Sequence, residues 1–254
     1  MEYVSPDGLR LDGRRTGEAR AMTFAFDVAD DADGSCEVTM GLTRALARCY
    51  GPNDDGASAR RVDAELAPTC AMECDYRDLT SERTQNVGYG KRSSDRRERE
   101  FARTMEEALR ATCELERWPR SRIRVDVVVV ANDGGAHACA MNAAVMALID
   151  AGVAVRDTLA CASVGVVDGE VLVDLNRAEE RARTSGVTMG AFSGDLGQSE
   201  VVMEVLERGK VSVGVFEEMH AWASAATGAL AARMRRATLK RTRALAESRA
   251  LEKF

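Results

Sequence analysis

Hydrophobic and polar residues alternate along the first part of the chain. The alternation covers Ala21–Asp27, Cys36–Met40 and Arg44–Tyr50, with clusters of Asp and Gly between them, and each segment predicts a β-strand. A loop is expected over Gly51–Ser58, because Gly, Pro, Asn and Asp gather there. The alternation that returns over Val62–Tyr76 predicts two further strands or one long bent strand.

A helical period then replaces the alternation. Arg96–Arg117 predicts a helix with Ser94 or Asp95 as its N-cap, because apolar and small side chains recur on one face. The members of this face are Phe101, Met105, Ala108, Leu109 and Thr112. The polar, Arg-rich segment Thr80–Asp95 in front of the helix predicts a surface loop.

A β-branched segment and a small-residue segment come next. Ile123–Ala131 predicts a buried strand, because Val and Ile occupy almost consecutive positions. The Asn, Asp and Gly residues at 132–135 break this strand. Residues Ala138–Ala151 are apolar on nearly every side, which predicts a buried helix ended by Gly152.

The remainder of the chain predicts strands and a long helix. The strand segments are Leu159–Val167, Val171–Leu175, Val187–Phe192 and Val201–Leu206, and the sequence VDGE between the first two predicts a hairpin turn. The helix runs from Glu217 to beyond Ala246, and its apolar stripe consists of Met219, Trp222, Ala223, Ala226, Leu230 and Met234. The irregular succession of strands and helices favours a mixed α+β class.

Composition narrows the class of protein. The 254 residues are enough to bury a full hydrophobic core, and no apolar stretch is long enough for a membrane span. The N-terminal residues lack the apolar segment of a signal peptide, so we expect a soluble, intracellular protein. Seven scattered Cys without a C-x-x-C pair, beside only two His, predict reduced thiols in the core and not a zinc site.

The balance of charged residue types adds to this picture. Thirty-five Lys and Arg against 41 Asp and Glu give a net charge of −6, and only four of the cations are Lys. Arg favours bidentate contacts with phosphate or carboxylate, but a coding bias explains the same enrichment equally well. A mildly acidic chain is not a general nucleic-acid binder, so any RNA contact must come from a local patch.

Three motifs together resemble the RNase PH family. They are SPDGLRLDGRR near the start, ANDGGAHACAMNAAVMALIDAGVAVRD over 131–157, and VGVVDGEVLVDLNRAEE over 164–180. Within that family, the first two are similar to the ring subunits of eukaryotic RNA exosomes that correspond to the archaeal catalytic ring subunit. The resemblance covers about residues 4 to 240 in order and spacing.

The resemblance implies an architecture. We expect an α+β RNase PH fold, with mixed β-sheets packed against helices, as a single domain with an extended N-terminal arm at residues 1–17. Residues 18–152 would form the N-terminal part of the fold, and 153–254 the C-terminal part with the long terminal helix. Six such folds form a ring around an RNA channel in this family.

The resemblance also implies binding partners and a cellular location. The partners expected are other RNase PH-like ring subunits, S1/KH-type cap subunits, an associated hydrolytic exoribonuclease and RNA. No membrane, no metal and no cofactor are expected. The implied location is the nucleus, with the nucleolus, and the cytoplasm.

The phosphate-binding motif departs from the active pattern. Active members release nucleoside diphosphates by letting phosphate attack the 3′-terminal linkage, and they hold that phosphate with glycines, a hydroxyl and an Arg. Here Gly135 is retained, but Ala136 stands at the hydroxyl position and His137 at the Arg position. A neutral imidazole offers one donor where a guanidinium offers five and a permanent charge. The resemblance therefore implies a vestigial phosphate site.

The acidic motif departs less from the pattern of active members than the phosphate-binding motif does. Active members place acids, which carry metal binding and general-acid work, at the positions of Asp174 and Glu180. Asp174 matches, whereas Glu180 replaces an Asp and moves its carboxylate by roughly 1 Å, a displacement that can cost about 10²-fold in rate. The alternatives are a strand-end acid bound to nearby N–H groups and a solvated loop acid. We expect both positions to be vestigial.

Two basic clusters are candidate contacts. By resemblance, Arg96, Arg97 and Arg99 at the start of the first long helix would lie near the RNA 3′ end; the alternative is a solvated face with local ion pairs. The segment 233–243 holds six cations and no acid. It is either a solvated helix terminus or a contact with RNA, a neighbouring subunit or an accessory nuclease.

Three functions remain open on the sequence. The first is a non-catalytic exosome ring subunit that channels RNA during 3′→5′ processing and degradation. The second is an active phosphate-dependent 3′→5′ exoribonuclease, against which Ala136 and His137 argue. An unrelated small-molecule enzyme using Asp133, Asp174 and His137 would require the motif matches to be chance.

Overall fold

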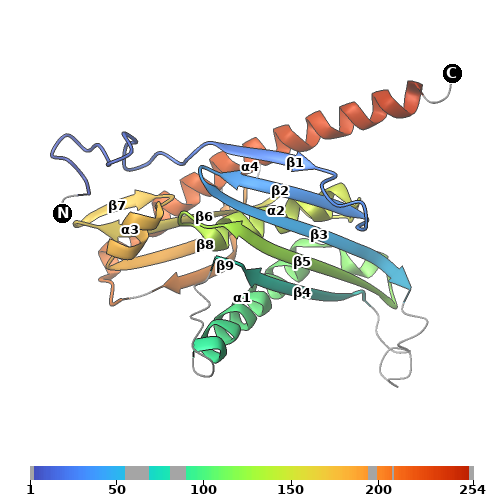
Figure 1. The fold of residues 1–254 in the computed structure, drawn as a ribbon, viewed down its shortest axis with the longest axis horizontal. Helices are drawn as coiled ribbons and strands as arrows, with labels where there is room; N and C mark the ends of the chain where they lie inside the picture. Colours follow the sequence, from blue (N-terminus) through green and yellow to red (C-terminus); the bar gives the residue numbers. More distant parts are fainter. Residues whose placement is uncertain (1–2, 55–68, 81–89, 194–198, 208, 252–254) are drawn as a thin grey trace.

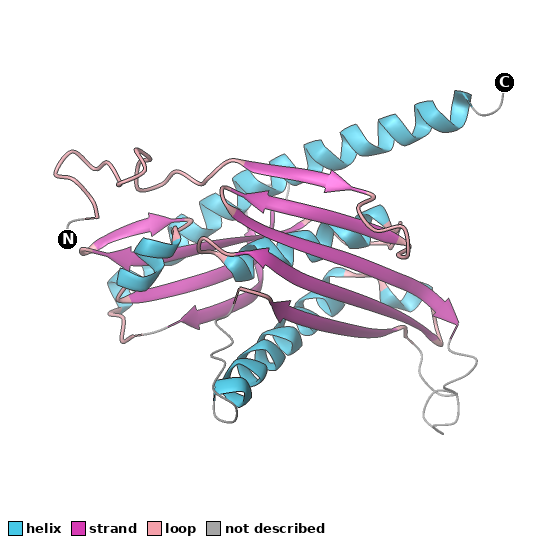
Figure 2. Cartoon of the chain, viewed as in Figure 1, coloured by secondary structure: helices cyan, strands magenta, loops and turns pink. Residues whose placement is uncertain are grey.

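Two β-sheets and the helices packed against them form the molecule (Figures 1 and 2). The computed structural model describes residues 3–54, 69–80, 90–193, 199–207 and 209–251. Helix α2 (Ala136–Asp150) packs against strands of both sheets, and its buried side chains join one continuous core. The expected α+β architecture is therefore confirmed.

The first sheet has five strands in the order β1-β2-β3-β5-β4. These are β1 (Met22–Phe26), β2 (Gly34–Met40), β3 (Thr43–Asp54), β4 (Ala71–Asp78) and β5 (Ser121–Ala131). All neighbours are antiparallel except β4 and β5, which are parallel.

The strand predictions for this sheet are confirmed with shifted bounds. Strand β3 continues past Tyr50 into the expected loop, because pairing with β5 extends to Asp54. Of the alternation predicted over 62–76, only the second part is seen, in β4, since 62–68 lie outside the described residues.

Helix α1 (Gly90–Thr112) covers the edge of the first sheet beside β4. Its predicted apolar face, from Phe101 to Thr112, is buried. The helix begins before Ser94, so the predicted cap and the predicted loop up to Asp95 are wrong; residues 81–89 of that loop lie outside the described ranges. The helix also ends before Arg117, because Cys113 pairs with Val155 and a separate 3-10 turn (η1, Leu115–Arg117) follows.

The second sheet has the order β7-β6-β8-β9, antiparallel throughout. Its strands are β6 (Leu159–Val167), β7 (Glu170–Val173), β8 (Ser185–Ser193) and β9 (Ser199–Glu207), close to the predicted bounds. Asp168 and Gly169 both have positive φ, the conformation that a two-residue hairpin turn requires. Between β7 and β8 lies a short helix that the sequence analysis missed, α3 (Arg177–Ala182).

Helix α4 (Val213–Leu251) packs along β6 and β8, and its last turns extend beyond the two sheets (Figure 1). The predicted stripe is buried at Met219, Ala223, Leu230 and Met234, but the Trp222 side chain is 38% exposed. Trp222 lies at the margin of the stripe, where its ring packs against Gly17 of the N-terminal segment. None of the helices in the described ranges is long and apolar enough to span a bilayer.

The N-terminal segment 3–17 has only isolated strand pairings, as an arm would, yet it is anchored. Arg10 is buried and pairs with Glu179 of α3, with Nε donating to Oε1 at 2.8 Å. Its Nη1 donates to the Val173 carbonyl at 2.7 Å. The arm is therefore fastened to the second half of the fold.

All seven Cys are free thiols, and six of them are buried. Burial raises the pKa of Cys49, Cys113 and Cys139 to about 12. These thiols are therefore protonated at neutral pH, and the prediction of Cys as small core residues is confirmed.

Candidate functional site

Two loops that come from different sheets meet at the start of α2. Gly134 and Gly135 lead into the helix with positive φ, and a Cβ on Gly134 would lie 2.3 Å from the carbonyl oxygen of Leu175. This close approach brings the glycine motif next to the acidic motif that begins at Asp174. The structure thus places the two predicted motifs together.

The carboxylate of Asp174 is fully engaged by Arg20. The backbone N–H and Nε of Arg20 donate to Oδ2 at 2.7 and 2.9 Å, and Nη2 donates to Oδ1 at 2.6 Å. Asp174 is 2% exposed and Arg20 8%. Asp174 is thus the strand-end acid of the alternative interpretation, with its N–H partners supplied by one Arg.

Arg20 also fixes the glycine loop. Its Nη1 donates to the Asp133 carbonyl and its Nη2 to the Gly134 carbonyl, each at 2.9 Å. One guanidinium therefore cross-links both loops of the site. Arg20 could not be singled out from the sequence, because nothing distinguishes it locally from the many other Arg.

His137 faces a carboxylate. Its Nδ1 lies 2.7 Å from Oε1 of Glu207, the last residue of β9, and its ring stacks on Phe101 of α1 with centroids 4.0 Å apart. A carboxylate only accepts hydrogen bonds, so Nδ1 carries the proton. Glu207 also pairs with Arg183, which in turn lies 3.3 Å from Glu180.

The two carboxyl groups of this cluster, Glu207 and Glu180, have pKa values shifted in opposite directions. Burial alone would raise the pKa of Glu207, but the hydrogen bond and charge of His137, together with Arg183, lower it to about 2. Burial raises the pKa of Glu180, and Glu207 adds to this, whereas Arg183 opposes it. Glu180 is therefore not a simple solvated loop acid: it belongs to a half-buried chain of charges.

Gly135, which precedes Ala136, lies close to a buried hydroxyl that the sequence did not mark out. A Cβ on Gly135 would lie 3.1 Å from Oγ of Ser163, on β6, and 3.3 Å from Oδ1 of Asp174. Ser163 Oγ is buried and has no hydrogen-bond partner among the described residues. Helix α2 has no side-chain cap at Gly135, so its first N–H groups receive no capping side chain from that residue.

The Arg residues predicted to contact RNA lie on the solvent side of α1. Arg96, Arg97 and Arg99 are exposed, and Arg96 Nε lies 2.8 Å from Glu100 Oε1. Arg97 precedes Phe101 by one helical turn, so it shares the face of α1 that leads to His137. Arg97 is therefore exposed one turn before the residue that stacks on His137, whereas Arg96 makes the local ion pair of the alternative interpretation.

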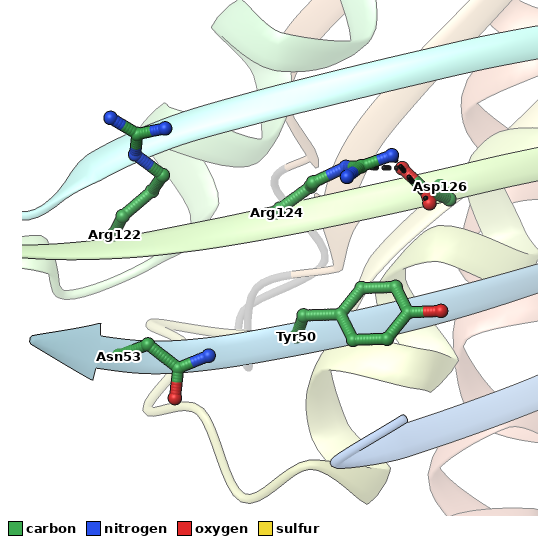
Figure 3. Close-up of a pocket in the computed structure, with 5 residues that line it drawn as sticks. All are labelled: Tyr50, Asn53, Arg122, Arg124 and Asp126. Carbon is green, nitrogen blue, oxygen red and sulfur yellow. Dashed lines mark hydrogen bonds and ion pairs between the residues drawn. The ribbon is translucent and has the colours of Figure 1, made fainter. Parts of the chain in front are cut away.

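The hollow in Figure 3 is separate from this site. It measures about 420 Å³ and lies on the first sheet, lined by Tyr50 and Asn53 from β3 and by Arg122, Arg124 and Asp126 from β5. Arg124 is bound to Asp126 at 2.8 Å. Within the described residues, no group of three or more His, Cys, Asp and Glu is arranged to hold a metal ion.

Comparison with known proteins identifies the class. The first domain of the 3′ exoribonuclease family, the RNase PH domain, matches residues 18–154, and its second domain matches residues 157–226. The chain therefore belongs to the RNase PH family of 3′ exoribonucleases.

Individual relatives are similar over most of their length. The exosome complex component RRP41 homolog of Arabidopsis thaliana is 33% identical over 251 residues, 98% of this chain and 100% of that protein. Exosome complex component RRP41 of Homo sapiens is 37% identical over 184 residues, 72% of each chain. The predicted family resemblance is confirmed.

Solved structures support the same fold. Rice (Oryza sativa) Rrp46 superposes with a TM-score of 0.73 at 26% identity, covering 90% of this chain and 100% of that chain. The Archaeoglobus fulgidus exosome with RNA bound to the active site gives a TM-score of 0.71 at 20% identity, covering 89% of this chain and 93% of that chain. The latter likeness concerns the fold alone.

Proposed function

We propose that this chain is a non-catalytic subunit of the RNA exosome core ring, with an architectural and RNA-channelling role. Membership of the RNase PH family and the similarity to proteins named exosome complex component RRP41 support the ring assignment. The observation that carries the non-catalytic part is the pairing of His137 with Glu207. The residue at the position where phosphorolysis needs a free guanidinium is an imidazole committed to a carboxylate.

The charges around the site oppose phosphate binding. Three guanidinium groups lie next to its acids: Arg20 holds Asp174, Arg183 holds Glu180 and Glu207, and Arg14 Nη1 lies 3.8 Å from Asp174 Oδ2. Among the described residues, each of these guanidinium groups already faces a carboxylate, which opposes its use to neutralise a phosphate ion. The uncapped N-terminus of α2 supplies only partial charge, equivalent to about half an elementary charge.

The RNA path is proposed to pass the start of α1. Arg97 is exposed on the turn before Phe101, and Arg96 and Arg99 lie beside it. Contacts with phosphate act without regard to base sequence and weaken with salt. The variant Arg96→Ala/Arg97→Ala should bind single-stranded RNA less tightly in the assembled ring and should reduce the salt dependence.

A matched control is available for this measurement. Arg117→Ala/Arg156→Ala removes two exposed cations far along the chain from α1's first turns, and it should leave RNA affinity unchanged. Equal affinity of both double variants at low salt would remove the α1 cations from the RNA path. Intact assembly of each variant is checked by native mass spectrometry.

The proposed partners are other RNase PH-like ring subunits, S1/KH-type cap subunits and an attached hydrolytic exoribonuclease. Native mass spectrometry of the complex purified through this chain should give masses of all three kinds. A stable monomer with no affinity for RNase PH-like subunits would refute the ring assignment. The proposed location, the nucleus with the nucleolus and the cytoplasm, is tested by imaging the tagged chain.

A further inference from the structure

The cations of α4 divide between two faces of the helix. Arg235 Nη2 binds Oδ1 of Asp157 at 2.6 Å and the Ser193 carbonyl at 2.9 Å, and Arg241 Nε binds Asp150 at 3.1 Å. These contacts fasten α4 to the body of the fold. Two of the six cations in segment 233–243 therefore have a structural role through ion pairs, and a third, Arg233, donates from Nη1 to the Arg20 carbonyl at 3.4 Å.

Three other cations face away from the body. Arg236, Lys240 and Arg243 are exposed, and they stand at spacings of four and three residues, which places them on one side of the helix. No ion pair involves them within the described residues. We name this surface the α4 basic face. It lies on the same turns of α4 as Arg241, whose side chain is bound to Asp150 on the opposite side of the helix.

Helix stability does not explain the α4 basic face. Like charges three or four residues apart destabilise a helix by about 0.2–0.5 kcal/mol per pair. The helix dipole favours cations only within the last turn, whereas α4 continues to Leu251, two turns past Arg243. The arrangement costs stability in the free chain, and an anionic ligand would remove that cost.

We propose that the α4 basic face binds the sugar-phosphate backbone of single-stranded RNA, outside the site around His137. The proposal deepens the RNA-channelling role and rests on it. Along the helix axis, Lys240 lies about 6 Å from Arg236 and about 4.5 Å from Arg243, a row of charges that suits a row of phosphates. Bidentate contacts from the two Arg would add to the point charge of the Lys.

The composition of the face favours RNA over an acidic protein. Its flanking residues are the small Ala229, Ala232 and Ala244 and the exposed acid Glu247, whereas a protein interface needs a core of large apolar side chains. Leu239 is the exposed large apolar residue of this segment, and it lies to one side of the row. It provides the variant that separates the two ligand classes.

The test uses the full chain, purified with the ring subunits that accompany it, and fluorescence anisotropy with labelled oligouridine RNA over a salt series. The triple variant Arg236→Ala/Lys240→Ala/Arg243→Ala should weaken binding. Its plot of log affinity against log salt should lose about 2 in slope, because each single-strand phosphate contact contributes about 0.7. The variant Leu239→Ala should bind RNA as the unchanged chain does.

A charge-matched control completes the design. Arg77→Ala/Arg117→Ala/Arg156→Ala changes the net charge equally by removing exposed cations from other surfaces, and should leave the slope unchanged. If the α4 triple variant and this control bind RNA alike, the proposal is wrong. It is also wrong if the α4 triple variant loses binding to a polyglutamate peptide but keeps its binding to RNA. A third contrary result is that Leu239→Ala alone releases a bound protein subunit while the triple variant keeps its RNA affinity.

The α1 double variant, measured in parallel, keeps this inference separate from the proposed function. Loss of affinity in Arg96→Ala/Arg97→Ala with an unchanged α4 triple variant overturns the α4 proposal and supports the α1 path. Loss in the α4 triple variant alone supports the α4 proposal and overturns the α1 path. No RNA binding by the unchanged complex overturns both.

Discussion

Asp174→Ala should lower the free energy of unfolding of this protein substantially, because it leaves the buried Arg20 without its carboxylate partner. Three hydrogen bonds join Arg20 to the Asp174 carboxylate, and the two residues are 8% and 2% exposed. Removing one partner of such a pair costs about 3–5 kcal/mol, against a total of about 5–15 kcal/mol for a typical domain. We expect that loss in the free energy of unfolding.

Urea denaturation of the purified chain, followed by circular dichroism, measures this loss. Asp133→Ala is the control: its carboxylate lies 3.7 Å from Arg20 and is 34% exposed, so its removal should cost less than about 1 kcal/mol. Adding Arg20→Met to Asp174→Ala should cost less than the sum of the two single changes. A loss below about 1 kcal/mol for Asp174→Ala would refute the structural role assigned to this pair.

Three further variants test other parts of the fold. Arg10→Met should cost about 3–5 kcal/mol, since it removes the hydrogen-bonded cation of the buried Glu179 and leaves only the longer contact with Arg14, at 3.9 Å; limited proteolysis should then cut the arm. Because the pKa of Glu207 is lowered to about 2, its contribution to the free energy of unfolding is complete above pH 4.5 and is lost as the pH falls toward 2. The melting temperature of Glu207→Gln should therefore fall less in acid than that of the unchanged chain. Gly134→Ala should cost more than Gly152→Ala, because both have positive φ but only at Gly134 would the Cβ meet backbone within 3 Å.

Local patterns predicted most of the elements of this fold. The turn at Asp168 and Gly169 follows from turn chemistry, and the buried face of α1 from helical spacing. Helix α3 was missed because it is shorter than two turns. Its one signal was a capping box, in which Asn176 accepts from backbone N–H groups while Glu179 bonds back.

The structure brings the predicted glycine and acidic motifs together at the start of α2. The ion-pair partners of Asp174 and His137 could not be predicted from the sequence. Asp174 and Arg20 are 154 residues apart in the sequence, and Glu207 reaches His137 only because β9 ends beside α1 and α2. Such pairings depend on tertiary packing, which a single sequence does not encode in any local period. The exposure of Trp222 has the same origin, since its ring meets the N-terminal arm.

The site geometry also changes how catalysis must be tested. A loss of activity in Asp174→Ala could come from unfolding, whereas Glu180 is half-buried and ion-paired at 3.3 Å with Arg183, so Glu180→Gln should fold. Loss of one pre-organised donor typically costs about 10²–10³ in rate, and the proposed function takes Ala136 and His137 to stand in place of a hydroxyl and a guanidinium. The two losses need not add, because residues of one site act as a unit.

The most direct measurement is phosphate-dependent release of nucleoside diphosphates by the ring, assembled without its hydrolytic nuclease and supplied with RNA, magnesium and phosphate. We expect no release above the phosphate-free control. The variant Ala136→Thr/His137→Arg/Glu180→Asp should restore weak activity at best. Phosphate-dependent release by the unchanged ring that Glu180→Gln abolishes, with assembly intact, would contradict the account and assign an active phosphorolytic enzyme.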